Sequence, residues 1–148
     1  MNIRPITPQD RDEWLRLRCA LWPEAISGHP ADIEDFFKNR LKILQAVLVA
    51  EAEPSPLIGF AELSIRAYAE GCETDHVGYL EGWYVDPDYR GAGVGRQLME
   101  AFEDWARQQG CTEVASDTEF HNEASAKAHA ACGFKEVESI RCFRKVLL

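Results

Sequence analysis

The chain has 148 residues, a formal net charge of −9 and a hydrophobic content of 46%. This length is enough to bury a real core, and we expect residues 1–148 to form a single domain. No apolar stretch reaches the roughly eighteen residues of a membrane span, and no basic and apolar leader opens the sequence, which favours a soluble cytoplasmic protein. The acidic balance argues against nucleic acid as a partner and would favour a cationic one.

The N-terminal half is predicted to contain a strand at 2–6, a helix from Thr7 to Trp22, an amphipathic segment over 33–44, and strands at 47–52 and 57–65. Thr7 has the form of a helix cap, and Pro8 suits the first helical position. The turn between the last two strands is predicted at 53–56, where two prolines interrupt the apolar pattern.

The C-terminal half is predicted to contain strands at 79–85, 113–117, 134–138 and 140–146, and helices at 93–109 and 123–132. A polar segment over 66–78 reads as an exposed loop. The whole order predicts an α+β fold with a mixed, largely antiparallel central sheet and helices on both faces. Its parallel part is expected around the strand, loop and helix that follow residue 79.

Five cysteines are scattered along the chain without a C-x-x-C pair, namely Cys19, Cys72, Cys111, Cys132 and Cys142. This odd set argues against a disulfide framework or a zinc site and predicts reduced, mostly buried thiols. Cys132 follows His129 by three residues, so a catalytic cysteine is one reading, although small buried cysteines are far commoner. The histidines have no metal-ligand spacing, and we expect no metal.

A glycine-rich turn, Arg90-Gly91-Ala92-Gly93-Val94-Gly95, lies between the strand at 79–85 and the helix after it. Such a turn presents unpaired N–H groups at a helix N-terminus, which suits phosphate oxygens. No Lys-Ser or Lys-Thr follows, as a Walker loop requires, and the glycine spacing differs from that of a dinucleotide fingerprint. A tight turn without a ligand is the alternative.

The pattern Arg-x-x-Gly-x-Gly after a strand ending in Val-x-Pro resembles the acetyl-CoA pyrophosphate loop of the GNAT superfamily of N-acetyltransferases. Finer motifs resemble the small aminoglycoside 6′-N-acetyltransferases, among them Leu17-Arg18, Leu21-Trp22-Pro23, Gly59 to Arg66, Leu80-Glu81-Gly82 and Ala115 to Thr118. The resemblance covers essentially the whole chain. It implies the GNAT fold, direct acetyl transfer from acetyl-CoA to the 6′-amine of an aminoglycoside, a role in antibiotic resistance, and a homodimer.

The resemblance also implies which residues hold acetyl-CoA. The backbone N–H groups of Trp83 and Val85 would grip the acetyl and pantetheine groups, with Tyr84 between them in the same cofactor site. The alternative is that both N–H groups are ordinary donors within the sheet. The pyrophosphate would bind along the loop, at Arg90, Gly91, Ala92, Gly93, Val94, Gly95 and Arg96. Asn122 precedes the last helix and could hydrogen-bond the pantetheine arm, although asparagine is equally suited to a helix cap.

Two carboxylates are candidates for the acceptor site, because a polycationic substrate needs several acidic partners. Glu81 lies two residues before Trp83, so we expect both side chains on the same side of the strand. Asp117 lies at the C-terminal end of the next predicted strand, where open sheets place ligands. Together Glu81 and Asp117 could hold the cation and draw a proton from the attacking amine. The alternative for each is a solvated surface acid.

Four further residues enter through the resemblance. Trp22 and Tyr68 could line the aminosugar pocket with apolar faces and cation–π contacts, although a Trp at a helix end is more often core. Glu138 would reach the substrate of a partner subunit. His129 stands where many GNAT enzymes have a tyrosine that protonates the departing thiolate. It could donate that proton, or it could be a packed, hydrogen-bonded helix histidine.

Two other functions stay open from the sequence. One is a GNAT enzyme for another cationic amine, such as a polyamine or a protein N-terminus. The other is a non-catalytic CoA-binding module, against which the carboxylates beside a complete glycine loop argue. Fold analogy alone does not separate the amines.

Overall fold

The computed structural model describes residues 1–53 and 56–148, so the turn predicted at 53–56 lies partly outside the described residues. Within these ranges the strands form one sheet in the order β1–β2–β3–β4–β5. Their bounds are β1 Asn2–Pro5, β2 Ala46–Glu51, β3 Leu57–Arg66, β4 Val77–Val85 and β5 Val114–Ser116. All neighbours are antiparallel except β4 and β5, which are parallel. The mixed, largely antiparallel sheet is therefore confirmed.

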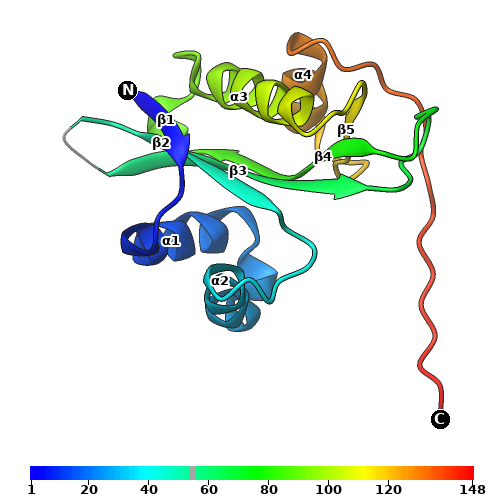
Figure 1. The fold of residues 1–148 in the computed structure, drawn as a ribbon, viewed down its shortest axis with the longest axis horizontal. Coiled ribbons are helices and arrows are strands. Elements are labelled where there is room, and N and C mark those ends of the chain that lie inside the picture. Colours follow the sequence, from blue (N-terminus) through cyan, green and yellow to red (C-terminus); the bar gives the residue numbers. More distant parts are fainter. Residues whose placement is uncertain (54–55) are drawn as a thin grey trace.

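Helices cover both faces of the sheet (Figure 1). On one face lie α1 (Arg11–Leu21) and α2 (His29–Phe37), and on the other lie α3 (Val94–Gln108) and α4 (Glu123–Ala131). The apolar stripe of α3, with Leu98, Met99 and Phe102, packs on a wholly apolar cluster from the sheet. Because this stripe repeats at helical spacing, the sequence predicted α3 to within about a residue at each end.

The core under α1 and α2 contains a buried ion pair. Arg18 of α1 donates from Nε and Nη2 to the two carboxylate oxygens of Glu62 in β3, at 2.8 and 3.1 Å. The Trp14 indole N–H donates to the same carboxylate at 3.0 Å. Arg18 and Glu62 are 5% and 1% exposed, and a charge this deeply buried needs such partners.

A β-bulge interrupts the pairing of β3 and β4. Glu62 pairs with Gly82 and Leu63 pairs with Leu80, which leaves Glu81 as the extra residue. The bulge moves Glu81 to the face of β3 that carries Ser64, whereas Trp83 contacts α3 and α4 on the other face. The expectation that Glu81 and Trp83 share one side is therefore wrong, because the extra residue breaks the alternation.

The last two predicted strands, 134–138 and 140–146, are not formed. Phe134 still packs against the core under α3, and Val137 lies beside Gly71, but the chain beyond them extends away from the body of the molecule (Figure 1). A strand requires a neighbour to pair with, and this segment pairs with none of the described strands. Most of its apolar side chains are exposed, with Val137 60% and Phe143 91% exposed. The prediction was wrong for a single copy of the chain, although the alternating apolar residues on which it rested are present.

Candidate active site

The turn between β4 and α3 has the backbone that a phosphate site requires. After β4 ends at Val85, Gly91 and Gly93 adopt φ angles of +80° and +88°. Only glycine adopts these angles without strain. A Cβ added at either position would meet no atom within 4 Å, so the space above the turn is open. The first N–H groups of the 15-residue helix α3, which begins at Val94, face this space without intrahelical partners.

Side chains brace this turn from below. The guanidinium of Arg90 donates from Nε to the Val85 carbonyl at 2.8 Å. Arg96 donates from Nη2 to the Ala131 carbonyl at the end of α4, also at 2.8 Å. The Trp83 indole N–H donates to the Gly95 carbonyl at 3.2 Å. These side chains are therefore committed to the protein, which leaves the backbone of the turn to meet a ligand.

The sheet opens beside the end of β4. In the described part of the chain, β4 and β5 are paired only from Gly78 and Val114 to Leu80 and Ser116. Residues 81–85 of β4 therefore have β3 along one edge and no β5 partner along the other. Backbone groups along that free edge are available to a ligand, and they lie next to the glycine turn.

Glu81 and Asp117 are joined through two side chains. Glu81 Oε2 accepts from Ser64 Oγ at 2.5 Å and from Arg66 Nε at 2.9 Å, and Oε1 accepts from Arg66 Nη2 at 2.7 Å. The Arg66 guanidinium carbon lies 3.5 Å from the centre of the Tyr79 ring. The Tyr79 hydroxyl donates to Asp117. The two predicted carboxylates thus belong to one polar network on the α1 and α2 face.

Two pKa shifts follow from this network. Burial raises the pKa of Tyr79 above its ordinary range, and the hydrogen bond to the Asp117 carboxylate raises it further. The hydrogen bonds to Glu81 raise the pKa of Arg66. Tyr79 therefore stays protonated as a donor to Asp117, and Arg66 stays a cation.

His129 lies on the opposite face, edge-on to the Trp83 ring with centroids 5.2 Å apart. Its Nδ1 is 2.7 Å from the Ser125 carbonyl, which can only accept, so we assign the proton to Nδ1. Its Nε2 is 2.8 Å from Ser116 Oγ at the end of β5. Both ring nitrogens are therefore hydrogen-bonded, and a proton moving to or from Nε2 would pass through Ser116.

The other predicted residues divide into two groups. The Trp22 ring reaches β4, since its Cη2 lies 2.5 Å from the position that a Cβ on Gly82 would take. Asn122 caps α4, with Oδ1 accepting from the Ser125 N–H at 3.1 Å. Tyr68 is 68% exposed, and Glu138 lies in the exposed C-terminal segment. A single chain therefore packs Trp22 against β4 at Gly82, the residue after Glu81, and leaves Glu138 exposed.

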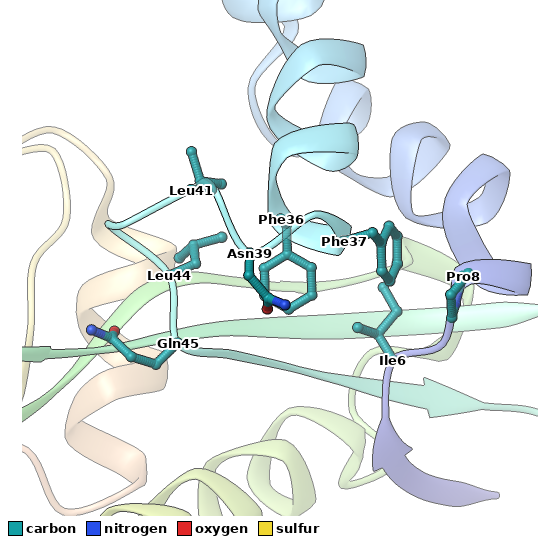
Figure 2. A pocket seen from close by; sticks show the side chains of 8 residues that line it. All are labelled: Ile6, Pro8, Phe36, Phe37, Asn39, Leu41, Leu44 and Gln45. Atoms are coloured by element: carbon teal, nitrogen blue, oxygen red, sulfur yellow. The ribbon is translucent and has the colours of Figure 1, made fainter.

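Two hollows of the surface are lined by none of the predicted site residues. One of about 320 Å³ lies between the end of α2 and the start of the chain (Figure 2), lined by Ile6, Pro8, Phe36, Phe37, Asn39, Leu41, Leu44 and Gln45. It contains none of the predicted site residues. A second, of about 290 Å³, lies beside β5 and is lined in part by Gly71, Ser116, Gly133 and Val137. Among residues 1–53 and 56–148, no three His, Cys, Asp or Glu side chains are grouped to hold a metal ion.

The sequence matches the profile of the Acetyltransferase (GNAT) family over residues 11–134. The chain belongs to the GNAT family. It is 49% identical to the aminoglycoside N(6′)-acetyltransferase type 1 of Klebsiella aerogenes, over 98% of this chain and 96% of that one. The relative from Stenotrophomonas maltophilia with the same name is 41% identical, over 99% and 94% of the two chains.

Solved structures agree with this assignment. The aminoglycoside 6′-N-acetyltransferase AAC(6′)-Ig of Acinetobacter haemolyticus superposes with a TM-score of 0.90 at 36% identity, over 99% of each chain. AAC(6′)-Iy in complex with the bisubstrate analogue CoA-S-monomethyl-acetylneamine superposes with a TM-score of 0.88 at 38% identity, over 99% and 98%. Among the described residues of this GNAT chain, no helix is long and apolar enough to span a membrane.

Three residues of the GNAT chain's polar network were given no role from the sequence: Ser64, Arg66 and Tyr79. A signal for each of them was present. Strand β3 is otherwise apolar, but Glu62, Ser64 and Arg66 place polar groups at every second position near its end. Such an alternation marks one face of a strand as polar. Tyr79 lies two residues before Glu81, so strand alternation already places both side chains on one face, and its hydroxyl reaches Asp117.

Proposed function

We propose that this chain is an aminoglycoside 6′-N-acetyltransferase that uses acetyl-CoA. The observation that carries this proposal is the 49% identity to a curated aminoglycoside N(6′)-acetyltransferase over nearly the full length of both chains. The relative AAC(6′)-Iy, which binds a CoA-linked neamine analogue, supports it. The whole chain, residues 1–148, would act as one catalytic domain in the cytoplasm, where free cysteines stay reduced.

The α3 and α4 face would hold acetyl-CoA. The backbone groups of Trp83 and Val85 point to the free edge of β4, whereas those of Tyr84 between them point to β3, in the register set by the Asp86 N–H bond to the Ile58 carbonyl. Tyr84 would therefore contact the cofactor only as their neighbour, and acetyl-CoA supplies the thioester carbonyl that this edge would polarise. The pyrophosphate would bind the turn and first helical residues, which are Arg90, Gly91, Ala92, Gly93, Val94, Gly95 and Arg96. Asn122 would act at the start of α4, where its side chain also caps the helix.

The α1 and α2 face would hold the acceptor. Glu81 and Asp117 would bind its ammonium groups, and one of them, directly or through water, would take a proton from the 6′-amine. The amine nitrogen then forms a bond to the acetyl carbon as the carbon–sulfur bond breaks, and the sulfur leaves with the electron pair. Trp22 and Tyr68 would line the aminosugar site. His129 would have to be an imidazolium, with a proton on each ring nitrogen, to serve as the acid. Its Nε2–H would then donate to Ser116 Oγ, the Ser116 hydroxyl would pass its own proton to the departing sulfur, and His129 would be left neutral with its proton on Nδ1.

A homodimer is part of the proposal. The C-terminal segment carries exposed Val137, Ile140, Phe143 and Val146 and is not paired with any described strand of its own copy. The sheet ends at the three-residue strand β5, whose outer edge is open in the described residues. Exchange of this segment between two copies would pair both edges and cover the apolar side chains. It would also carry Glu138 to the partner's acceptor site.

Sedimentation tests the dimer. The unchanged protein is expected to sediment as a dimer at micromolar concentration. Replacing Val137 and Phe143 by Asp should shift it to the monomer, because the exchanged segment would then bury two charges. A monomeric unchanged protein would contradict the proposed homodimer. It would not decide whether the protein acetylates aminoglycosides, which is tested separately.

Regiospecific acetylation tests the activity. Kanamycin and tobramycin, which carry a 6′-amine, should be acetylated with release of CoA thiol. An otherwise similar aminoglycoside with a 6′-hydroxyl should be a far poorer acceptor, because an alcohol is a weak nucleophile at neutral pH. Mass spectrometry and NMR of the product would locate the acetyl group. Good turnover of a polyamine or a peptide N-terminus, with no turnover of any aminoglycoside, would favour the alternative GNAT functions.

A further inference from the structure

The acceptor face already holds a cation. Arg66 makes two hydrogen bonds to Glu81, at 2.9 and 2.7 Å, with one to each carboxylate oxygen. Its guanidinium also lies over the Tyr79 ring, with the central carbon 3.5 Å from the ring centre. Tyr79 in turn donates to Asp117. Arg66 therefore lies between the two carboxylates that a cationic acceptor would need.

An acceptor ammonium would compete with this guanidinium. Both oxygens of Glu81 already accept from Arg66, and Oε2 also accepts from Ser64 at 2.5 Å. A second cation at the same carboxylate would share these oxygens with Arg66 and be repelled by it. Binding of an ammonium at Glu81 is therefore weaker while the guanidinium stays in place.

Arg66 is also placed to move. It is the last residue of β3 and borders the exposed loop before β4, and its side chain is 41% exposed. A buried carboxylate–guanidinium pair of this face, Arg18 and Glu62, has side chains that are 7% and 2% exposed, which fixes it in the core. A swing of the Arg66 side chain into solvent would need no change in the sheet.

We infer that Arg66 is the resident cation of the acceptor site, and that its guanidinium leaves Glu81 when an ammonium group of the acceptor binds. This inference rests on the proposed function, since it names the group that the acceptor replaces. Arg66 is thus a residue that sets acceptor affinity. A polycation can offer ammonium groups to Glu81 and Asp117 together, which offsets the loss of the guanidinium contacts.

Calorimetry of kanamycin binding in the presence of CoA tests the inference. Arg66→Gln should bind kanamycin about tenfold more tightly than the unchanged protein, because the competing charge is gone. Arg66→Lys keeps the charge and should stay within about threefold of the unchanged protein. Added methylguanidinium should weaken kanamycin binding to Arg66→Gln and have less effect on the unchanged protein, whose guanidinium site is filled.

Arg107→Gln is the matched control for net charge. Arg107 lies on α3, its side chain is 68% exposed, and it pairs with Asp104 at 2.9 Å far from the network. This variant should change kanamycin affinity by less than about twofold. Arg66→Met, which also removes the charge, repeats the comparison if the glutamine variant unfolds in thermal melting.

Weaker kanamycin binding by Arg66→Gln, or unchanged binding with a lower kcat, would overturn the inference and make Arg66 a fixed support for Glu81. If the unchanged protein binds no aminoglycoside, the proposed function fails, and spermidine then replaces kanamycin as the polycationic probe. Tighter spermidine binding by Arg66→Gln would still support the inference. No gain in binding of either probe would overturn it.

Discussion

The two faces of strand β4 offer different chemical groups to a ligand. On the α3 and α4 face, Trp83 and the glycine turn offer backbone groups, and the nearby arginines are committed to carbonyl oxygens. On the α1 and α2 face, the groups that a ligand would meet are polar and charged side chains, with Glu81, Arg66, Tyr79 and Asp117 in one network. Backbone groups suit a ligand that is always the same, whereas side chains can be retuned for different amines.

The cores under the two faces differ in the same way. The cluster under α3 is apolar throughout. The cluster under α1 and α2 surrounds the buried Arg18–Glu62 pair and the Trp14 indole that bonds to it. Charge is therefore present both at the surface and in the core of the acceptor side. The variants below test whether the two sides are as separate as their contacts indicate.

The largest effect is expected at the buried pair. Glu62→Gln should lower the free energy of unfolding by about 3 to 5 kcal/mol, because Arg18 would keep a buried charge with its main partner lost. Urea denaturation measures this. Glu34→Gln, which breaks the exposed pair with Arg11, should cost less than about 1 kcal/mol. Equal costs for the two variants would show that burial does not distinguish them.

The next effect is expected at the acceptor carboxylates. Asp117→Asn and Glu81→Gln should each lower kcat/KM for kanamycin on the order of tenfold to a thousandfold, through lost proton transfer or charge pairing. The affinity for acetyl-CoA should stay unchanged, because both side chains lie on the other face from the turn. Asp104→Asn, which removes an exposed carboxylate on α3, is the control. Wild-type kinetics in both variants would mean that the amine binds elsewhere.

A smaller effect is expected at the turn. Gly93→Val should weaken acetyl-CoA binding about thirtyfold, the equivalent of one lost charge-assisted hydrogen bond, because the side chain would occupy the space above the backbone. Gly110→Val is the matched control, since Gly110 has a φ of +86° and open space around it at the other end of α3. Calorimetry should find wild-type affinity for the control. The same affinity in a folded Gly93→Val protein would sink the phosphate assignment.

The smallest effect concerns the start of the acceptor-side helices. Hydrogen bonds from Arg4, at 2.7 and 2.9 Å, hold the pKa of Asp10 below its ordinary value. A lowered native pKa adds stability above the unfolded pKa of about 3.9 and loses it as the pH falls through the native value. Asp10→Asn should therefore cost about 1 kcal/mol of unfolding free energy at pH 7 and progressively less below about pH 4. If the loss of unfolding free energy in Asp10→Asn did not change with pH, the ionised pair of Arg4 and Asp10 would not be its cause.

Much of this molecule could be predicted from its sequence because the determining signals are local. The stripe of α3 and the glycines before it depend on residues within one turn of each other, and both prediction and structure agree there. The bulge at Glu81 could not be predicted in the same way. It depends on how β3 and β4 settle against each other, with Glu62 held by Arg18 from a distant helix.

The prediction of strands in the C-terminal segment was wrong for a different reason. Its alternating apolar residues predicted strands. Such alternation shows that a segment is able to pair, but not that a neighbouring strand is available for it to pair with. Within one chain the sheet ends at β5, and the segment extends away from it. Glu138 was therefore not brought to the site by the fold of a single copy.

Gly82 restricts how this protein can change over evolution. A Cβ at this position would lie 2.5 Å from the Trp22 ring, which is a rigid side chain packed against Phe60 and under Arg18. Any side chain introduced at Gly82 must displace Trp22, so a single substitution at this position would disturb the packing around the Trp22 ring. Tyr68, in the loop before β4, is 68% exposed and meets no such packing constraint. The loop before β4 can therefore change its side chains at a cost that Gly82 in the strand does not permit.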